Sequence, residues 1–203
     1  MVQVFDISDK LDISKILPDV LNRLPCWRLK KALAYRFETD RFLCAKSFLM
    51  LEEMLRQNCG LDTCPEFSYE SNGKPYLKER PDIFFNISHC RKGIACAVSD
   101  RPIGVDIEEI QYDGHLAEII LNASELEAVR KSAEPSIEFT TFWTCKESCL
   151  KLTGEGIRDD MKNILSDTTG ICLKTEINRS AGYVCTVAAD SGTKNRADRH
   201  FAG

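Results

Sequence analysis

The first half of the chain combines helical and extended hydrophobic patterns. Apolar residues recur three and four positions apart over residues 13–24 and 27–60, which predicts a short helix and then one or two longer helices ending at Gly60. Shorter apolar or alternating runs predict strands at residues 2–7, 82–90 and 93–100. Residues 66–77 place an Asn-Gly turn between two such runs, which predicts a strand, a turn and a second strand.

The second half of the chain follows a similar order. The pattern predicts a strand, two helices and a closing pair of strands at residues 102–110, 122–132, 136–154, 170–177 and 182–190. Asn122 or Ser124 is the expected N-cap of the first of these helices, and Gly154 ends the second. A polar tail follows at residues 191–203.

Two apolar runs resemble each other. "GIACAVSD" at 93–100 and "GYVCTVAAD" at 182–190 share a leading Gly, a core with Cys and Val, and a closing Asp. The sequence therefore predicts an α+β fold of two similar halves, residues 1–102 and 103–190, with the polar tail outside them. Ligands often bind between such halves, so we expect the site in the cleft between them.

Composition and charge narrow the possible functions. Of the 203 residues, 43% are hydrophobic and 29% are charged, which is typical of a globular protein. The net charge of −4 gives no general attraction to nucleic acid or to an anionic membrane, and no segment has the apolar length of a membrane span. The first ten residues lack the basic and apolar regions of a signal peptide, so the expected compartment is the cytoplasm.

The ten cysteines form no C-x-x-C pair, and only three histidines accompany them, His89, His115 and His200. Spacing typical of a zinc site is therefore absent. We expect reduced thiols that pack as small hydrophobic groups, because disulfides are rare in proteins that are not secreted.

Two carboxylates share one face of the predicted strand in "IGVDIEEI". Side chains alternate along a strand, so Asp106 and Glu108 point the same way, opposite to Ile107. A hard divalent cation such as Mg²⁺ between them would offset their repulsion. The alternative is a solvated polar face of an amphipathic strand.

Two charges also interrupt the apolar stripe of the predicted helix 136–154. Lys146 and Glu147 both fall at helical spacing from Phe139 and Trp143. Such charges are unexpected there, because burying a charge is costly unless it is paired or binds a metal.

Glu147 allows two interpretations. It can form an ordinary i,i+4 pair with Lys151, beside a lysine that extends to solvent. Alternatively, the stripe borders a cleft, where Glu147 is the third oxygen ligand beside Asp106 and Glu108 and Lys151 meets an anionic substrate. A metal-and-polyphosphate site would join these groups to other polar residues.

Those other residues come from the first half of the chain. Ser88 and His89 are predicted where a strand runs into a loop, a common place for site residues. A lone His is more often structural than catalytic. Lys74 lies in a predicted turn. Basic residues are dense between residues 23 and 46, which indicates either a solvated helix face or a phosphate site.

The order of the motifs "NGKPYL", "FNISHC", "IGVDIEEI" and "FWTCKESCLKLTGEG" resembles the Sfp-type 4′-phosphopantetheinyl transferases. The resemblance implies that the protein moves the phosphopantetheine arm of coenzyme A to a serine of an acyl or peptidyl carrier protein, releasing adenosine 3′,5′-bisphosphate. It also implies Mg²⁺ dependence and a monomer of two similar halves with the site between them.

The resemblance further implies roles for individual residues. The Mg²⁺ ligands would be Asp106, Glu108 and Glu147, and the catalytic residues would be Asp106, Glu147 and Lys151. Glu147 would be the base for the carrier serine, directly or through water. The residues that contact coenzyme A would be Lys31, Arg36, Gly73, Lys74, Pro75, Ser88, His89 and Lys151. Leu43 departs from the family, which has a basic residue there, so the contacts to the 3′-phosphate stay open.

Two other functions remain possible from the sequence. One is another Mg²⁺-dependent nucleotide phosphotransferase or phosphodiesterase, which would need no carrier protein. The other is a non-catalytic module that binds coenzyme A or a carrier protein. Such a module would be expected to lack a metal ligand, and none of the three carboxylates is missing.

Overall fold

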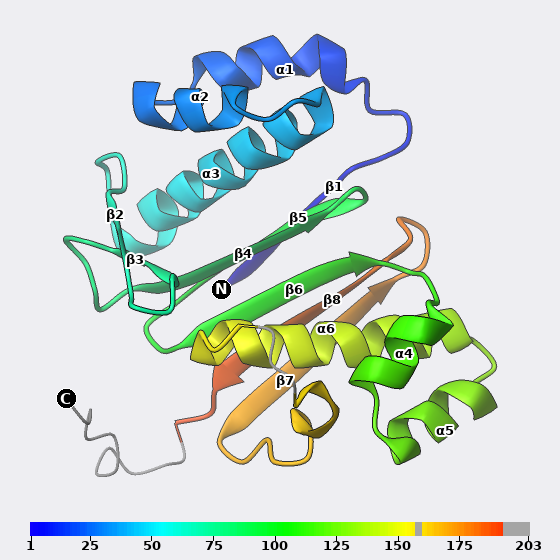
Figure 1. The fold of residues 1–203 in the computed structure, drawn as a ribbon. Coiled ribbons are helices and arrows are strands. Elements are labelled where there is room, and N and C mark those ends of the chain that lie inside the picture. Colours follow the sequence, from blue (N-terminus) through cyan, green and yellow to red (C-terminus); the bar gives the residue numbers. More distant parts are fainter. Residues whose placement is uncertain (157–159, 193–203) are drawn as a thin grey trace.

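The computed structural model describes residues 1–156 and 160–192 and shows a mixed α+β protein with three small antiparallel sheets (Figure 1). The first sheet has the order β1-β5-β4, formed by Val2–Asp6, Gly93–Ser99 and Phe84–Cys90. The second is the hairpin of β2 (Phe67–Tyr69) and β3 (Pro75–Leu77). The third has the order β6-β8-β7, formed by Ile103–Glu109, Tyr183–Asp190 and Ile171–Asn178.

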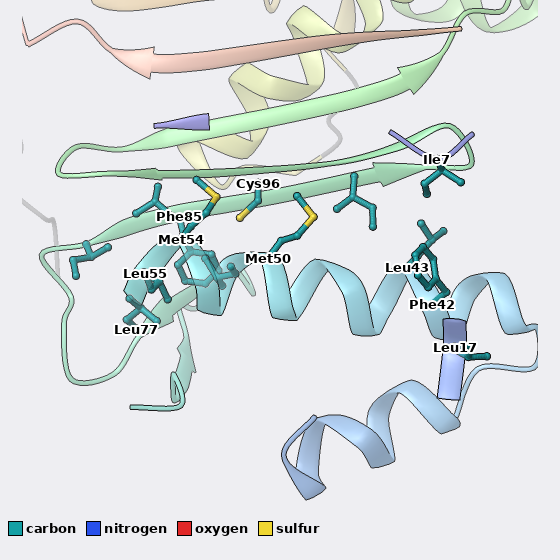
Figure 2. Close-up of a cluster of buried hydrophobic side chains, with 14 residues drawn as sticks. Ile7, Leu17, Phe42, Leu43, Met50, Met54, Leu55, Leu77, Phe85 and Cys96 are labelled. Carbon is teal, nitrogen blue, oxygen red and sulfur yellow. The ribbon is translucent and has the colours of Figure 1, made fainter. Parts of the chain in front are cut away.

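Three helices accompany the first sheet: α1 (Ile13–Asn22), α2 (Cys26–Leu33) and α3 (Glu38–Cys59). As predicted, α3 ends at Gly60, whose φ of 64° is the left-handed conformation that glycine adopts without strain. Figure 2 shows α3 packed on the sheet, where Met50 and Met54 lie opposite Phe85 and Cys96. The hydrophobic core of this half forms along that contact.

Three helices and one short turn accompany the third sheet: α4 (Gly114–Ile120), α5 (Ala123–Lys131), α6 (Pro135–Thr153) and the 3-10 turn η1 (Met161–Asn163). Asn122 is the N-cap of α5 and forms a reciprocal capping box with Glu125. The left-handed Gly154 ends α6, as the sequence predicts.

The two larger sheets meet through β4, β5 and β6. The backbone N–H of Val105 donates to Asn86 Oδ1 at 3.1 Å, and the Tyr183 hydroxyl donates to Asp6 Oδ1 at 2.8 Å. One buried cluster combines residues of both sheets: Ala95, Ala97, Ile103, Val105, Ile107, Tyr183 and Cys185. The sheets therefore share a hydrophobic contact instead of being joined by a linker alone.

Several sequence predictions need correction. The range 27–60 forms two helices, which is one of the two possibilities predicted for it, but α4 and η1 were not predicted. The strand β4 ends at Cys90, as predicted, and its ladder with β5 continues to the pair of Cys90 and Gly93. Ser88 and His89 therefore lie within a strand and not in the loop after it.

The run at 93–100 and the run at 182–190 correspond to β5 and β8, each the central strand of its three-stranded sheet. The predicted polar tail lies outside the described residues from 193 onward. Within residues 1–156 and 160–192, no helix has the length and apolar character needed to cross a membrane.

Candidate active site

A pocket of about 300 Å³ opens where β4, β6 and α6 meet. It is lined by Ile87, Ser88, His89, Asp106, Glu108, Trp143, Glu147 and Lys151. The pocket thus collects three carboxylates and one ammonium group from segments that are distant in the sequence. It includes all four residues for which the resemblance implies a role as metal ligand or catalytic group: Asp106, Glu108, Glu147 and Lys151.

The regular geometry of β6 and α6 explains how these side chains reach the pocket. On β6, Asp106 and Glu108 are two residues apart and face the same side, as alternation along a strand requires. On α6, Trp143, Glu147 and Lys151 are four residues apart and form one row along the helix. The strand and the helix each present one functional face to the pocket.

A glycine allows the strand and the helix to approach closely. A Cβ atom added to Gly104 would collide with the Ser148 carbonyl oxygen and the Leu152 nitrogen, which are both backbone atoms of α6. Any larger residue at this position would separate β6 from α6. Gly104 therefore helps to bring Asp106 within reach of Lys151.

Lys151, Ser88 and Asp106 form a closed hydrogen-bonded group. The Lys151 ammonium donates to Asp106 Oδ1 at 2.6 Å and to Ser88 Oγ at 2.8 Å. The Ser88 hydroxyl donates to the same Oδ1 at 2.8 Å. Asp106 is only 2% exposed, so this pairing compensates for burying its charge.

Two carboxylate oxygens in the pocket remain without a partner. Asp106 Oδ2 and Glu147 Oε1 are buried, and no hydrogen bond reaches either of them from the described residues. A buried charged oxygen without a donor is unusual and costly. These two atoms are therefore available to a cation or to a donor group of a ligand.

Burial and mutual repulsion raise the pKa values of the two glutamates. Desolvation, followed by the nearby Asp106 charge, raises the pKa of Glu108 to about 7, although Lys151 and the Trp143 indole oppose the shift. Desolvation and Asp106 also raise the pKa of Glu147, and Lys151 again opposes the shift. Among the described lining residues, three carboxylates share one ammonium group, that of Lys151, so additional positive charge would stabilise their ionised forms.

The chemistry of these groups fits a hard cation, because they offer carboxylate oxygens and no soft ligands. The side chains are not gathered around a common point, however. Within residues 1–156 and 160–192 there is no group of three or more His, Cys, Asp or Glu side chains close enough together to hold a metal ion. One ion could therefore be shared only after the side chains rotate. The residues that carry the two unpartnered oxygens, Asp106 and Glu147, line the same pocket.

Lys146 neither extends to solvent nor borders the cleft, so both interpretations of the charged stripe are wrong for this residue. Its side chain is fully buried, and its ammonium lies 3.0 Å from Glu125 Oε1 and 3.0 Å from the Met161 carbonyl oxygen. Consecutive helical residues differ in direction by about 100°, so Lys146 and Glu147 face different neighbours. Lys146 joins α6 to α5 and η1, while Glu147 faces the pocket.

Only some of the residues expected to contact coenzyme A lie at the pocket. Ser88, His89 and Lys151 line the pocket. Lys31 and Arg36 are exposed on α2 and just after it and do not line the pocket. Gly73, Lys74 and Pro75 form the turn of the β2–β3 hairpin and the start of β3, where the Lys74 ammonium donates to the Leu152 carbonyl at 2.7 Å.

Sequence reasoning gave no site role to Trp143 or Ile87, although both line the pocket. The signal for Trp143 was present, because it precedes Glu147 by four residues and therefore lies on the same helical face. Ile87 is an apolar residue inside an apolar strand, and nothing in its local pattern distinguishes it from a core residue.

Residues 102–189 match a family model described as the 4′-phosphopantetheinyl transferase superfamily. This region contains β6, α6 and all three carboxylates of the pocket. The match therefore covers the half of the chain that carries the charged groups, while Ser88 and His89 lie outside it.

Curated relatives carry the same description. The chain is 39% identical over 94 residues to 4′-phosphopantetheinyl transferase psf-1 of Bacillus pumilus, covering 45% of this chain and 40% of the relative. It is 31% identical over 143 residues to a 4′-phosphopantetheinyl transferase of Bacillus subtilis, covering 66% and 63%. It is 29% identical over 134 residues to 4′-phosphopantetheinyl transferase Sfp of Bacillus subtilis (strain 168), covering 63% and 60%. The matched part of the chain thus spans between 40% and 63% of these relatives' lengths.

Proposed function

We propose that this chain, which belongs to the 4′-phosphopantetheinyl transferase superfamily through residues 102–189, transfers phosphopantetheine from coenzyme A to a carrier protein. The acceptor would be a serine of an acyl or peptidyl carrier protein, and the second product would be adenosine 3′,5′-bisphosphate. Mg²⁺ is the proposed metal. The cytoplasmic location and the monomeric state remain predictions.

One observation carries this proposal. Asp106, Glu108 and Glu147 line a single pocket together with Lys151, which pairs with Asp106, and two of their oxygens are buried without a hydrogen bond from the described part of the chain. A site meant only for stability would not concentrate like charges in this way, because their repulsion raises the free energy of the folded state. A site that receives Mg²⁺ and a pyrophosphate needs this arrangement.

The three carboxylates would hold the metal. Mg²⁺ bound by Asp106, Glu108 and Glu147 would neutralise charge on the pyrophosphate of coenzyme A. Asp106 would contribute the unpartnered Oδ2 while its Oδ1 stays with Lys151 and Ser88. Glu147 would contribute the pocket-facing carboxylate of α6.

The reaction would be a displacement at phosphorus. The carrier serine Oγ bonds to the phosphorus that bears pantetheine, and the bond from that phosphorus to the oxygen of the adenosine 3′,5′-bisphosphate leaving group breaks. Glu147, whose pKa burial raises, would accept the serine proton directly or through water. Lys151 uses two of its three donors within the protein, so its third N–H can stabilise charge on the departing phosphate.

The nucleotide would extend toward the first half of the chain. We assign residues 1–102 to the coenzyme A side and residues 103–190 to the metal and catalytic side, in a fold of two similar halves. Ser88 and His89 would lie next to the phosphates, and the turn of Gly73, Lys74 and Pro75 next to the adenine. Lys31 and Arg36 are the proposed partners of the 3′-phosphate, and both are exposed and accessible to a ligand.

Intact mass of an apo carrier protein tests the proposal. Incubation with this protein, coenzyme A and Mg²⁺ should add the mass of one phosphopantetheine group to the carrier. EDTA should prevent the gain, and a carrier with its acceptor serine changed to alanine should show none. Cleavage of coenzyme A without a gain on any carrier would instead indicate a phosphodiesterase. Binding of coenzyme A without cleavage would indicate a non-catalytic module.

A further inference from the structure

The β2–β3 hairpin reaches across the molecule to the catalytic helix. Lys74 and Leu152 are 78 residues apart in the sequence, yet the Lys74 ammonium donates to the Leu152 carbonyl oxygen at 2.7 Å. Figure 1 shows the turn of this hairpin beside one end of α6.

The turn that carries Lys74 has a well-defined conformation. Gly73 has a φ of 86°, and its N–H donates to the Glu70 carbonyl at 2.9 Å. The Lys74 N–H donates to Asn72 Oδ1 at 2.9 Å, and the Lys74 carbonyl accepts from the Glu70 N–H at 2.9 Å. These bonds fix the backbone from which the Lys74 side chain extends.

The hairpin itself is fixed to the first half of the protein. The Phe67 ring packs on Phe85 of β4 with ring centroids 5.4 Å apart, and Leu77 is buried in the core beneath α3. Figure 2 shows Leu77 and Leu55 next to each other in this core. The base of the hairpin is therefore anchored, so a contact made by its turn can restrain the element that it touches.

The contact falls on a part of α6 that needs a partner. The last four carbonyl groups of a helix have no N–H donor within the helix, and they form its negative end. An ammonium at Leu152 satisfies one of these carbonyls and has the sign of charge that stabilises this end. Burial lowers the pKa of Lys74, which agrees with an ammonium enclosed between the two elements.

The end of α6 is also shaped to receive the turn. A Cβ atom on Gly154 would lie 2.7 Å from Asn72 Nδ2 and 3.1 Å from Lys74 Cδ. The left-handed φ of 79° favours glycine here, and the nearby atoms of the hairpin belong to the Asn72 and Lys74 side chains. The hydrogen bond and the close approach at Gly154 both place the turn of the hairpin against the helix end.

We infer that Lys74 is a positioning residue: its ammonium caps the end of α6 and holds Lys151 opposite Asp106. Leu152 directly follows Lys151, so the restraint acts on the backbone next to the lysine that pairs with Asp106. The resemblance placed the turn of Gly73, Lys74 and Pro75 next to the nucleotide. Positioning of α6 by Lys74 is a role beyond that contact. The effect on turnover rests on the proposed function, whereas the restraint on α6 does not.

Amide hydrogen exchange in the ligand-free protein tests the restraint. Lys74→Met removes the cap and should speed exchange of the amides in the last turn of α6, including that of Gly154, by about tenfold. Lys74→Arg keeps a charged donor and should stay within about threefold of the wild type. Lys78→Met is the matched control, because Lys78 lies just beyond the same hairpin and its ammonium forms an exposed ion pair with Glu66.

Kinetics test the consequence. At saturating coenzyme A we expect Lys74→Met to lower kcat for carrier modification by about tenfold or more, while Lys78→Met leaves kcat within about twofold of the wild type. Lys74→Arg should recover most of kcat. If Lys74→Met does not fold, Lys74→Gln takes its place with the same expected directions.

Unchanged exchange in the last turn of α6 would overturn the inference, whatever happens to coenzyme A binding. Weaker coenzyme A binding together with unchanged exchange would make Lys74 a ligand contact only. If the wild-type protein modified no carrier, the proposed function would fail. The exchange measurement would still decide the restraint.

Discussion

At the residue scale, the pocket keeps a carboxyl group, Glu108, in surroundings that disfavour its charge. Its pKa of about 7 lies above the value of an exposed glutamate, so between about pH 4.5 and pH 7 the folded state binds more protons than the unfolded state. The stabilisation from that proton is present at low pH and is lost as the pH rises toward 7. Glu108 therefore lowers stability at neutral and higher pH when no cation is bound.

Glu108→Gln should remove this penalty. At pH 8 in EDTA we expect the free energy of unfolding to rise by about 1–2 kcal/mol, after allowing for partial exposure to solvent. At pH 5 the gain should nearly vanish, because Glu108 is already protonated there. Urea denaturation at both pH values measures this, with Glu109→Gln, which does not line the pocket, as control. If the Glu108→Gln protein were no more stable than the wild type at pH 8, the raised pKa of Glu108 would be contradicted.

The sequence predicted which residues share one face of β6 or one face of α6, but not which residues they meet across the pocket. Alternation along a strand was sufficient to place Asp106 and Glu108 together, and helical spacing placed Glu147 with Lys151. The spacing could not show that Lys146 turns away from the pocket toward Glu125, because a broad apolar stripe on a helix can face two neighbours at once.

At the element scale, the site depends on how closely β6 and α6 pack. The long periodic helices and the hairpins were predictable, because each carries many apolar positions and a glycine or turn at its end. The short helix α4 was missed, since seven residues starting at Gly114 give too little periodicity. The crossing of β6 and α6 at Gly104 is a tertiary contact that local patterns do not encode.

Gly104→Ala should separate the two elements. The added methyl group meets backbone atoms of α6, which cannot rotate away, so we expect a loss of about 1–3 kcal/mol in the free energy of unfolding. Turnover should fall further than stability alone explains, because Asp106 moves away from Lys151. Thermal denaturation and kcat measure the two effects.

Gly114→Ala is the control, because a Cβ there meets nothing closer than 3.7 Å and the residue lies in a helix. Its stability should equal or exceed that of the wild type. Wild-type stability and turnover in Gly104→Ala would show that the close approach is not required.

At the scale of the whole molecule, the two larger sheets share a buried cluster and the hydrogen bond between Tyr183 and Asp6. Neither side of this contact would remain covered if the other half unfolded. The sequence echo predicted two halves, but the shared core between them depends on which faces of β4, β5 and β6 meet. Strand patterns that are apolar on both faces do not determine this choice.

The chain should therefore unfold as one cooperative unit. Its two tryptophans report on different halves, Trp27 beside Phe48 of α3 and Trp143 in the pocket face of α6. We expect Trp27→Phe and Trp143→Phe proteins, each with one remaining tryptophan, to show coincident fluorescence and circular dichroism midpoints in urea. In either variant, a fluorescence midpoint well separated from the circular dichroism midpoint would mean that the halves unfold independently.

The central claim is that the carboxylate pocket is the site of phosphopantetheine transfer, and intact-mass analysis of an apo carrier with wild-type and Asp106→Asn proteins tests it most directly. Asp106→Asn keeps the side-chain shape but removes the charge that pairs with Lys151 and would bind Mg²⁺. We predict a Mg²⁺-dependent gain of one phosphopantetheine group with the wild type and a rate at least about 100-fold lower with the folded variant. Equal rates for the two proteins would contradict the assignment of this pocket.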